Sequence, residues 1–190
     1  TKEIKGNVRE IAELINRSER PFIYFGGGVR LGDAGAELRE LINRADIPAA
    51  HTLMAAGVLG YGEKNNMGLM GMHGNYSANA AVSRADVLIA IGTRFSDRVA
   101  LNTEKFAPNA SIVHIDIDPS EINKNVIADY SIVGDVKEVL CEMLKYVKEA
   151  KHDAWRDHIE HWKNEDYKPV DSDTEIKPHF IVEKACELAG

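Results

Sequence analysis

Two hydrophobic patterns alternate along the chain. Short, nearly continuous apolar runs are typical of strands covered on both faces, and they occur at 22–26, 47–52, 86–92, 111–118 and 130–135. Between them, apolar residues recur every three or four positions, which predicts helices over 7–18, 34–45, 76–85 and 136–150, with a turn of helix over 119–125. This alternation predicts an α/β fold with a doubly wound, parallel sheet.

One long segment lacks both patterns. Glycines recur without a fixed period between Met54 and Asn75, at 57, 60, 62, 68, 71 and 74. A regular helix or strand tolerates less glycine than this, because glycine loses the most conformational freedom on folding. The sequence therefore predicts a long loop across 54–75.

The pattern changes again after Lys151. Residues 152–169 are rich in charged and aromatic side chains, and 171–178 consist mainly of turn formers and charges. The final stretch, HFIVEKACELAG (179–190), has the helical period but nothing nearby in sequence to pack on. We therefore expect one domain over 1–150, a linker with a charged helix over 151–177, and the first helix of a further domain over 178–190.

The composition is that of an ordinary globular protein. Its 190 residues are 44% hydrophobic and 28% charged, with a formal net charge of −7. A negative charge without a basic block argues against a nucleic-acid partner, and no run resembles a membrane span or a signal peptide, so we expect a cytoplasmic protein without membrane contact. Cys141 and Cys186 have no neighbouring Cys or His at metal-ligand spacing, so no metal site is expected.

A glycine cluster follows the first strand. Gly26, Gly27 and Gly28 precede a helix, where backbone N–H groups and a helix amino terminus can approach a diphosphate. The alternative is a tight turn without a ligand. The second strand ends in His51 and Thr52, and it lacks the acidic residue that holds the ribose of a nicotinamide cofactor. An ordinary NAD site is therefore disfavoured.

The apolar run at 86–92 opens onto a charged loop. Arg94, Asp97 and Arg98 follow this strand directly, at the sheet edge where open α/β folds bind their ligands. Arginine pairs bidentately with phosphate and stacks on flat rings, which favours a ligand site. The alternative is a solvated ion pair between Asp97 and an arginine, which would contribute little to stability.

Other strand ends carry polar groups of the same kind. Met72 and His73 close the glycine-rich loop ahead of a helix, and Asp116 ends a strand, where a carboxylate can accept ribose hydroxyls. For Asp118 we expect a loop-capping role. No Ser or Cys lies in a nucleophile elbow and the histidines are scattered, so the sequence predicts a binding domain without catalytic residues.

Several segments, in order and spacing, resemble one family. GGGVR, LMGMHGNYSANAAVSRADVLIAIGTRFSDRV, KFAPNASIVHIDIDPSEINKN and SIVGDV are similar to the central domain of the large catalytic subunit of acetolactate synthases (acetohydroxyacid synthases). The resemblance covers essentially 8–150, and 178–190 resembles the start of that family's carboxyl-terminal domain. It implies a three-layer, six-stranded, Rossmann-like fold of the DHS-like NAD/FAD-binding type that carries FAD, with thiamine diphosphate and Mg²⁺ held by other domains.

The resemblance also implies which residues hold the flavin. The positions that match the family's flavin contacts are Gly26, Gly27, Gly28, Thr52, Leu53, Met54, Met72, His73, Gly92, Arg94, Asp97, Arg98, Val99, Asp116, Ile117, Asp135 and Val136. Met72 and Arg98 are further similar to residues that face the substrate channel. The family's usual RFDDR is RFSDR here, so that Ser96 replaces a carboxylate beside the flavin.

The implied activity is the condensation of two pyruvates, or of pyruvate with 2-oxobutyrate, with loss of carbon dioxide, in branched-chain amino-acid synthesis. The implied working unit is a homodimer or homotetramer, to which a small regulatory subunit can bind. Two alternatives stay open. One is the central domain of another thiamine-diphosphate enzyme, such as glyoxylate carboligase or pyruvate oxidase, and the other is a non-catalytic nucleotide-binding module that binds ADP without a preference for flavin.

Overall fold

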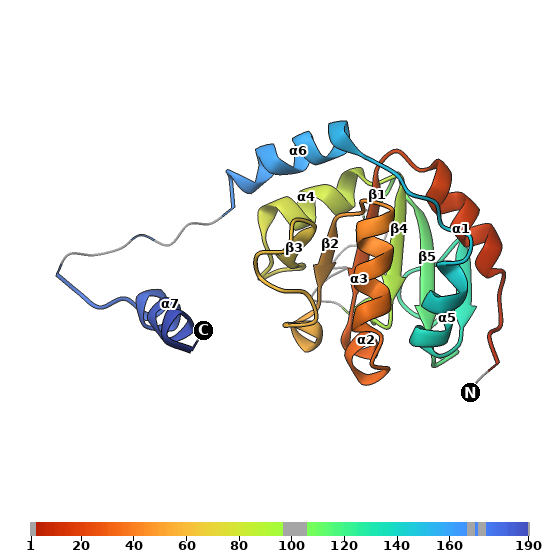
Figure 1. Ribbon diagram of the computed structural model, residues 1–190, viewed down its shortest axis with the longest axis horizontal. Helices are drawn as coiled ribbons and strands as arrows, with labels where there is room; N and C mark the ends of the chain where they lie inside the picture. Colours follow the sequence, from red (N-terminus) through yellow and green to blue (C-terminus); the bar gives the residue numbers. More distant parts are fainter. Residues whose placement is uncertain (1–2, 97–105, 167–169, 171–173, 190) are drawn as a thin grey trace.

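A six-stranded, wholly parallel sheet forms the centre of the protein (Figure 1). The computed structural model describes residues 3–96, 106–166, 170 and 174–189. The strand order is β3-β2-β1-β4-β5-β6, and every neighbouring pair is parallel. The strands are β1 (Pro21–Phe25), β2 (Ala49–His51), β3 (Asn66–Leu69), β4 (Val87–Ile91), β5 (Ser111–Asp116) and β6 (Tyr130–Val133). The order is that of the doubly wound dinucleotide-binding folds, in which the direction of winding reverses between β1 and β4.

Helices cover both faces of the sheet, which confirms the three-layer α/β fold (Figure 1). The helices are α1 (Val8–Arg17), α2 (Gly27–Leu31), α3 (Gly35–Arg44), α4 (Tyr76–Arg84), α5 (Val136–Met143), α6 (Asp153–Lys163) and α7 (Pro178–Ala189), with a 3₁₀ turn, η1, at Leu53–Ala55. Apolar side chains of α1, α2, α3 and α5 form one core with one face of the sheet. Those of α4 and α6 form a second core on the other face.

The central strands are buried on both sides, as their continuous apolar runs predict. Every residue of β1 and β4 is buried. Because side chains alternate across a strand, Ile23 and Phe25 enter the first core, whereas Phe22 and Tyr24 enter the second. The two central strands therefore join the two cores into one molecule.

The structure differs from the sequence prediction in three segments. The glycine-rich segment 54–75, predicted as a loop, contains the edge strand β3, in which Gly68 has φ +74°. The strand lies at the edge of the sheet and only Met67 of its four residues is buried, so its short sequence carries no alternating apolar pattern. The helix predicted over 136–150 ends at Met143, and residues 119–125 form turns without a helix.

The edge of β6 is covered by the start of the chain. Lys5 N–H donates to the Val133 carbonyl at 2.9 Å, and Val133 N–H donates back to the Lys5 carbonyl at 2.9 Å. This pair is an isolated antiparallel bridge beside an otherwise parallel sheet. It satisfies backbone groups that an open sheet edge would present to solvent.

Helix α6 completes the second core. Trp155, Ile159 and Trp162 are buried in it, and the Trp155 indole N–H donates to the Pro21 carbonyl at 3.0 Å. Arg156 forms an ion pair with Asp46 and donates to the Asn65 side chain at 2.8 Å. The charged segment after residue 151 is thus fastened to the amino-terminal ends of β1 and β2.

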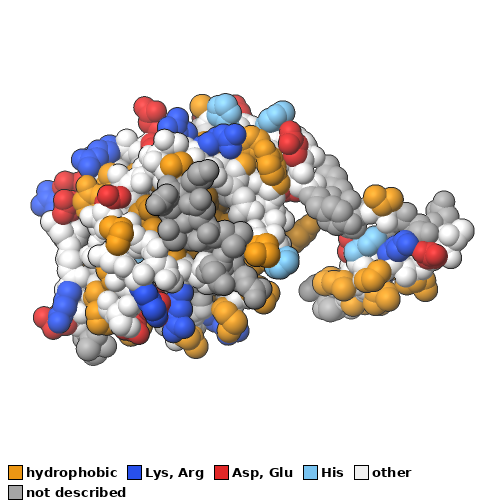
Figure 2. Space-filling model, turned by 180° about the vertical axis from the view of Figure 1, so that it is seen from behind, with side chains coloured by type: hydrophobic (Ala, Val, Ile, Leu, Met, Phe, Trp, Pro, Cys, Tyr) orange, Lys and Arg blue, Asp and Glu red, His pale blue; other side chains and the backbone are white. Residues whose placement is uncertain are grey.

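Helix α7 has no such anchorage. None of its residues up to Leu188 is buried, and apolar side chains gather on its surface (Figure 2). In the described parts of the chain, no helix is long and apolar enough to cross a membrane.

We predict that Trp155→Ala lowers the free energy of unfolding by about 3–5 kcal/mol, because it opens a cavity in the second core. Urea denaturation followed by circular dichroism measures this change. Tyr61 is fully exposed, so Tyr61→Ala is the matched aromatic control, with an expected change within about 0.5 kcal/mol. A loss below about 1 kcal/mol for Trp155→Ala would show that α6 is not part of the cooperative fold.

Candidate functional site

The site residues expected from the sequence follow the carboxyl ends of the strands. Because all six strands are parallel, these ends share one edge of the sheet. The segments are Gly26–Gly28 after β1, Thr52–Met54 after β2, Met72 and His73 after β3, Gly92 and Arg94 after β4, Asp116 and Ile117 at the end of β5, and Asp135 and Val136 after β6. Neighbouring strands lie about 4.8 Å apart, so this edge is roughly 24 Å wide. Asp97, Arg98 and Val99 lie outside the described residues.

Two of the three clustered glycines are required by close packing of the backbone. The N–H groups of Gly26 and Gly28 donate to the carbonyls of Ile91 and Gly92, at 3.0 and 2.9 Å. A Cβ on Gly28 would lie 2.7 Å from the Cα of Gly92, and one on Gly26 would lie 2.5 Å from the Gly92 carbonyl oxygen. These two amides are already used inside the protein. Gly27 instead faces Met54, whose Cβ lies 3.1 Å from the position of an added Cβ.

Apolar side chains project into solvent at this edge. Leu53, Met54, Met72 and Ile117 have exposed fractions of 75%, 62%, 53% and 52%. All four were expected as ligand contacts. Leu53 and Met54 follow β2, Met72 follows β3, and Ile117 follows β5. Exposed apolar area next to backbone of several strands is typical of ligand-binding surfaces. This edge can therefore cover a flat apolar group.

Near these side chains, Thr52 has an unused polar atom. Its hydroxyl oxygen is buried and has no hydrogen-bond partner among the described residues. Buried polar groups are almost always paired, because leaving one unpaired costs about 1–3 kcal/mol. A ligand with a donor or acceptor at this point would satisfy it. His73, by contrast, is exposed in the loop ahead of α4.

Of the two arginines in the charged loop, Arg94 lies within the described residues. Its side chain is 74% exposed, and its Nε lies 3.5 Å from the Glu121 carboxylate, which is only 8% exposed. Glu121 also pairs with Lys124 at 2.9 Å. Sequence reasoning missed Glu121. Its position, three residues after the turn-forming Asp118, gave no signal of burial.

The carboxylates at this edge accept hydrogen bonds from backbone N–H groups. The Asp116 carboxylate accepts from the Asp118 N–H at 2.9 Å, and the Asp135 carboxylate accepts from Lys137 N–H at 3.0 Å as the amino-terminal cap of α5. Asp118 accepts from Ser120 N–H at 2.9 Å, as the loop-capping prediction expects, and hydrogen bonds from Ser120 lower the pKa of Asp118. Free acceptor capacity for a ligand is therefore limited to the remaining carboxylate lone pairs.

A buried histidine lies below the charged loop. His114 on β5 is 1% exposed, and its Nε2 lies 3.0 Å from the Thr93 carbonyl oxygen, to which it donates. Its ring contacts Phe95 edge to face at 5.0 Å between centroids. Burial lowers the pKa of His114, because a charged imidazole loses hydration inside the protein.

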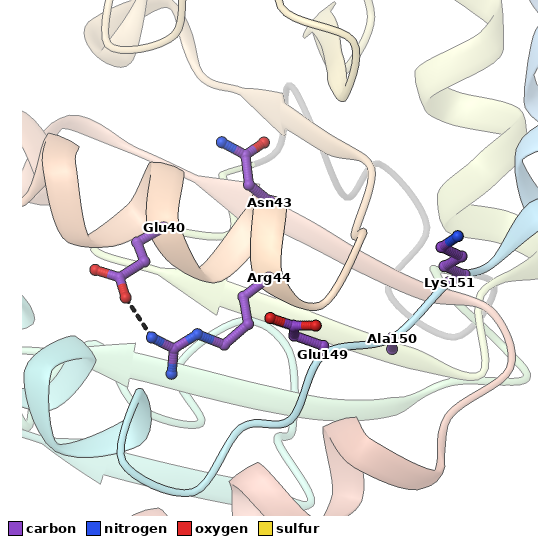
Figure 3. A pocket seen from close by; sticks show the side chains of 6 residues that line it. All are labelled: Glu40, Asn43, Arg44, Glu149, Ala150 and Lys151. Atoms are coloured by element: carbon purple, nitrogen blue, oxygen red, sulfur yellow. Dashed lines mark hydrogen bonds and ion pairs between the residues drawn. The ribbon is translucent and has the colours of Figure 1, made fainter.

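A hollow of about 740 Å³ lies at the other end of the sheet (Figure 3). Its lining residues are Glu40, Asn43, Arg44, Glu149, Ala150 and Lys151, from the end of α3 and the segment before α6. The charges there pair locally, with Arg44 held by Glu40. None of the expected site residues lines it, so the carboxyl edge remains the candidate site.

Comparison with known proteins shows the family of the chain. Residues 8–143 match the family model described as the thiamine pyrophosphate enzyme central domain. The chain is 41% identical over 199 residues to an acetolactate synthase large subunit of Mycobacterium tuberculosis, with 100% of the chain and 32% of the relative aligned. It is 44% identical to a probable acetolactate synthase large subunit of Methanocaldococcus jannaschii, with 95% of the chain and 31% of the relative aligned. For the isozyme 3 large subunit of Escherichia coli the identity is 35%, with 97% and 33% aligned.

We predict that the protein loses stability as the pH falls below about 6.5, because the unfolded chain takes up a proton at His114 before the folded protein does. The loss attributable to this residue is at most about 1.4 kcal/mol per pH unit. Urea denaturation of the protein and of His114→Gln between pH 5 and 8 measures it, with a shallower pH dependence expected for the variant. An unchanged slope in His114→Gln would contradict the assignment, and the exposed His158→Gln is the control.

Proposed function

Because the chain belongs to the family of thiamine pyrophosphate enzyme central domains, we propose that it is the central domain of an acetolactate synthase large subunit. The chain spans about a third of the length of the curated relatives it matches. Nearly all of it aligns with them, including the residues beyond the family model's end at 143. This alignment of nearly the whole chain, at 35–44% identity, is the observation that carries the proposal.

The proposed reaction of the whole enzyme joins two pyruvates, or pyruvate and 2-oxobutyrate. One pyruvate loses its carboxylate as carbon dioxide, and the former ketone carbon of its remaining two-carbon unit forms a new bond to the ketone carbon of the acceptor, whose oxygen takes up a proton. Thiamine diphosphate supplies the carbanion chemistry of such a step when it is bound. We place thiamine diphosphate and Mg²⁺ on the flanking parts of the enzyme. Within the described residues, no group of three or more metal-ligating side chains gathers.

The role proposed for this domain is to hold FAD along the carboxyl edge of its sheet. Dinucleotides bind doubly wound sheets at this edge, around the point where the strand order reverses. The exposed Leu53, Met54 and Met72 can cover a flat ring, and the unpaired Thr52 hydroxyl can meet a polar atom of the ligand. Arg94 offers a guanidinium to phosphate.

The remaining residues of the expected contact set have smaller roles in the proposed FAD site. Gly27 leaves room for a ligand to approach the backbone, whereas the amides of Gly26 and Gly28 are used internally. Asp97, Arg98 and Val99 enter through the resemblance alone. Ser96 stands where the family has a carboxylate, so this loop carries one negative charge less toward a flavin diphosphate.

The proposed organisation of the chain has a central domain over 1–150, a connecting segment over 151–177 whose helix α6 packs onto that domain, and the start of the following domain over 178–190. The exposed apolar residues of α7, among them Phe180, Ile181 and Leu188, support this division, because a following domain would cover them. A homodimer or homotetramer, a small regulatory subunit and a cytoplasmic location are part of the same proposal.

We predict that the 190-residue chain binds FAD at least tenfold more tightly than ADP, because the apolar side chains at the carboxyl edge contact the flavin ring. Arg94→Ala should weaken FAD binding by about 5- to 50-fold through loss of a charge-assisted hydrogen bond. Isothermal titration calorimetry measures both affinities. Arg9→Ala is the matched control, since Arg9 is 70% exposed and likewise pairs with a glutamate through its Nε.

Each outcome of the titration is informative. Equal affinities for FAD and ADP would favour a nucleotide-binding module without a flavin. Binding by the full-length subunit alone would show that the flanking domains complete the site. Absence of FAD binding in both proteins would refute the flavin proposal.

We also predict that the 190-residue chain forms no acetolactate from pyruvate when thiamine diphosphate and Mg²⁺ are supplied, whereas the full-length subunit does. The described residues contain no cluster of metal-ligating side chains that would anchor the diphosphate. A colorimetric assay of acetolactate after acid decarboxylation measures the product. Product formed by the 190-residue chain alone would overturn the assignment of the chemistry to the flanking domains.

A further inference from the structure

The backbone around Arg94 is anchored from one side by side chains. Beyond β4, Thr93 and Phe95 are buried while Arg94 between them is exposed. The Thr93 carbonyl accepts from His114 Nε2 at 3.0 Å, and the Phe95 carbonyl accepts from Asn125 Nδ2 at 2.8 Å. The two carbonyls that flank Arg94 in sequence are therefore both fixed.

Both anchors belong to one neighbouring stretch of chain. His114 is on β5, which pairs with β4 in register, so that Ala90 lies opposite His114. Asn125 lies in the turns that follow β5, and the same turns carry Glu121, which holds the guanidinium of Arg94. The stretch from His114 to Asn125 thus contacts the Thr93 carbonyl, the Arg94 guanidinium and the Phe95 carbonyl.

We infer that His114 and Asn125 are positioning residues of the proposed flavin site, which hold the backbone on both sides of Arg94 so that its guanidinium is directed toward the ligand. The inference rests on the proposed function. It assigns a role to two side chains that are not among the expected flavin contacts. Without the hydrogen bonds from His114 and Asn125, the residues after β4 would gain backbone freedom, and ligand binding would then have to remove it.

The hydrogen bonds define a backbone position that packing alone does not. The ring of Phe95 contacts the rings of Tyr24 and His114, at 6.3 and 5.0 Å between centroids. Ring contacts of this kind tolerate rotation and sliding, whereas a hydrogen bond to a carbonyl fixes the orientation of a peptide plane. Removing the donor and keeping the volume therefore separates positioning from packing.

The test compares variants that keep or lose the donor. His114→Gln keeps an N–H group at the place of Nε2, and His114→Met loses it at similar volume. Asn125→Leu removes the second donor from an exposed turn and leaves the core untouched. Ile112→Ala is the stability control, because Ile112 is buried on the same face of β5 and contacts no carbonyl of the charged loop through hydrogen bonds.

Two measurements are made on the 190-residue chain and on the full-length subunit. Calorimetry gives the FAD affinity, and hydrogen exchange of the ligand-free protein gives the protection of the amides of 94–96. We expect His114→Met and Asn125→Leu each to weaken FAD binding about tenfold and to speed exchange at 94–96 by a similar factor. His114→Gln should keep the FAD affinity and the exchange rates within about threefold of the unmodified protein. Ile112→Ala should lower stability with little change in either quantity.

The results that overturn the inference differ from those that overturn the proposed function. Unchanged FAD affinity and exchange in His114→Met and Asn125→Leu would overturn the inference and leave the flavin site in place. Equal losses in Ile112→Ala and His114→Met would show that general destabilisation is the cause, which also overturns it. Failure of both unmodified proteins to bind FAD would overturn the flavin proposal and the inference together, whatever the exchange data show.

Discussion

The contact between the backbones of Gly28 and Gly92 is the constraint on which the carboxyl edge depends. It lies where β1 meets β4, the point at which the sheet reverses its direction of winding. A Cβ on either residue would lie 2.7–2.8 Å from the Cα of the other, so both positions require glycine. Gly92 also has φ +55°, a backbone conformation that glycine adopts more easily than other residues. Any larger residue would push the first turn of α2 away from β4 and open the centre of the edge.

This contact changes the meaning of the glycine cluster. In many phosphate-binding turns the amides of clustered glycines point outward to the ligand. Here the amides of Gly26 and Gly28 close the turn onto β4, so less of the backbone is free for a ligand. In the proposed flavin site, the side chains around this turn would then supply most of the recognition. They are apolar, with one exposed arginine among the described residues after β4, which suits a large flat cofactor better than a small anion.

The sequence predicted most of the fold because its apolar runs are strong local signals. β1, β4 and β5 were found for that reason, and the parallel arrangement followed from the alternation of strands and helices. β3 was missed because an edge strand with a glycine at positive φ carries no such pattern. The partners of Arg94 and Phe95 were missed for a different reason. Glu121 and Asn125 become their neighbours only through pairing of β4 with β5, and a single sequence does not show which turn lies beside which strand end.

The bridge between Lys5 and Val133 gives the two edges of the sheet different protection against aggregation. At β6, the start of the chain occupies the backbone groups to which a strand of another molecule would bind. At β3, the strand is short, Gly68 has φ +74° and the pairing with β2 is irregular, and these features disfavour a flat open edge. Resistance to edge-to-edge association therefore depends on tertiary pairing at one side and on local backbone geometry at the other. A chain trimmed back to the start of α1 would lose the first protection and keep the second.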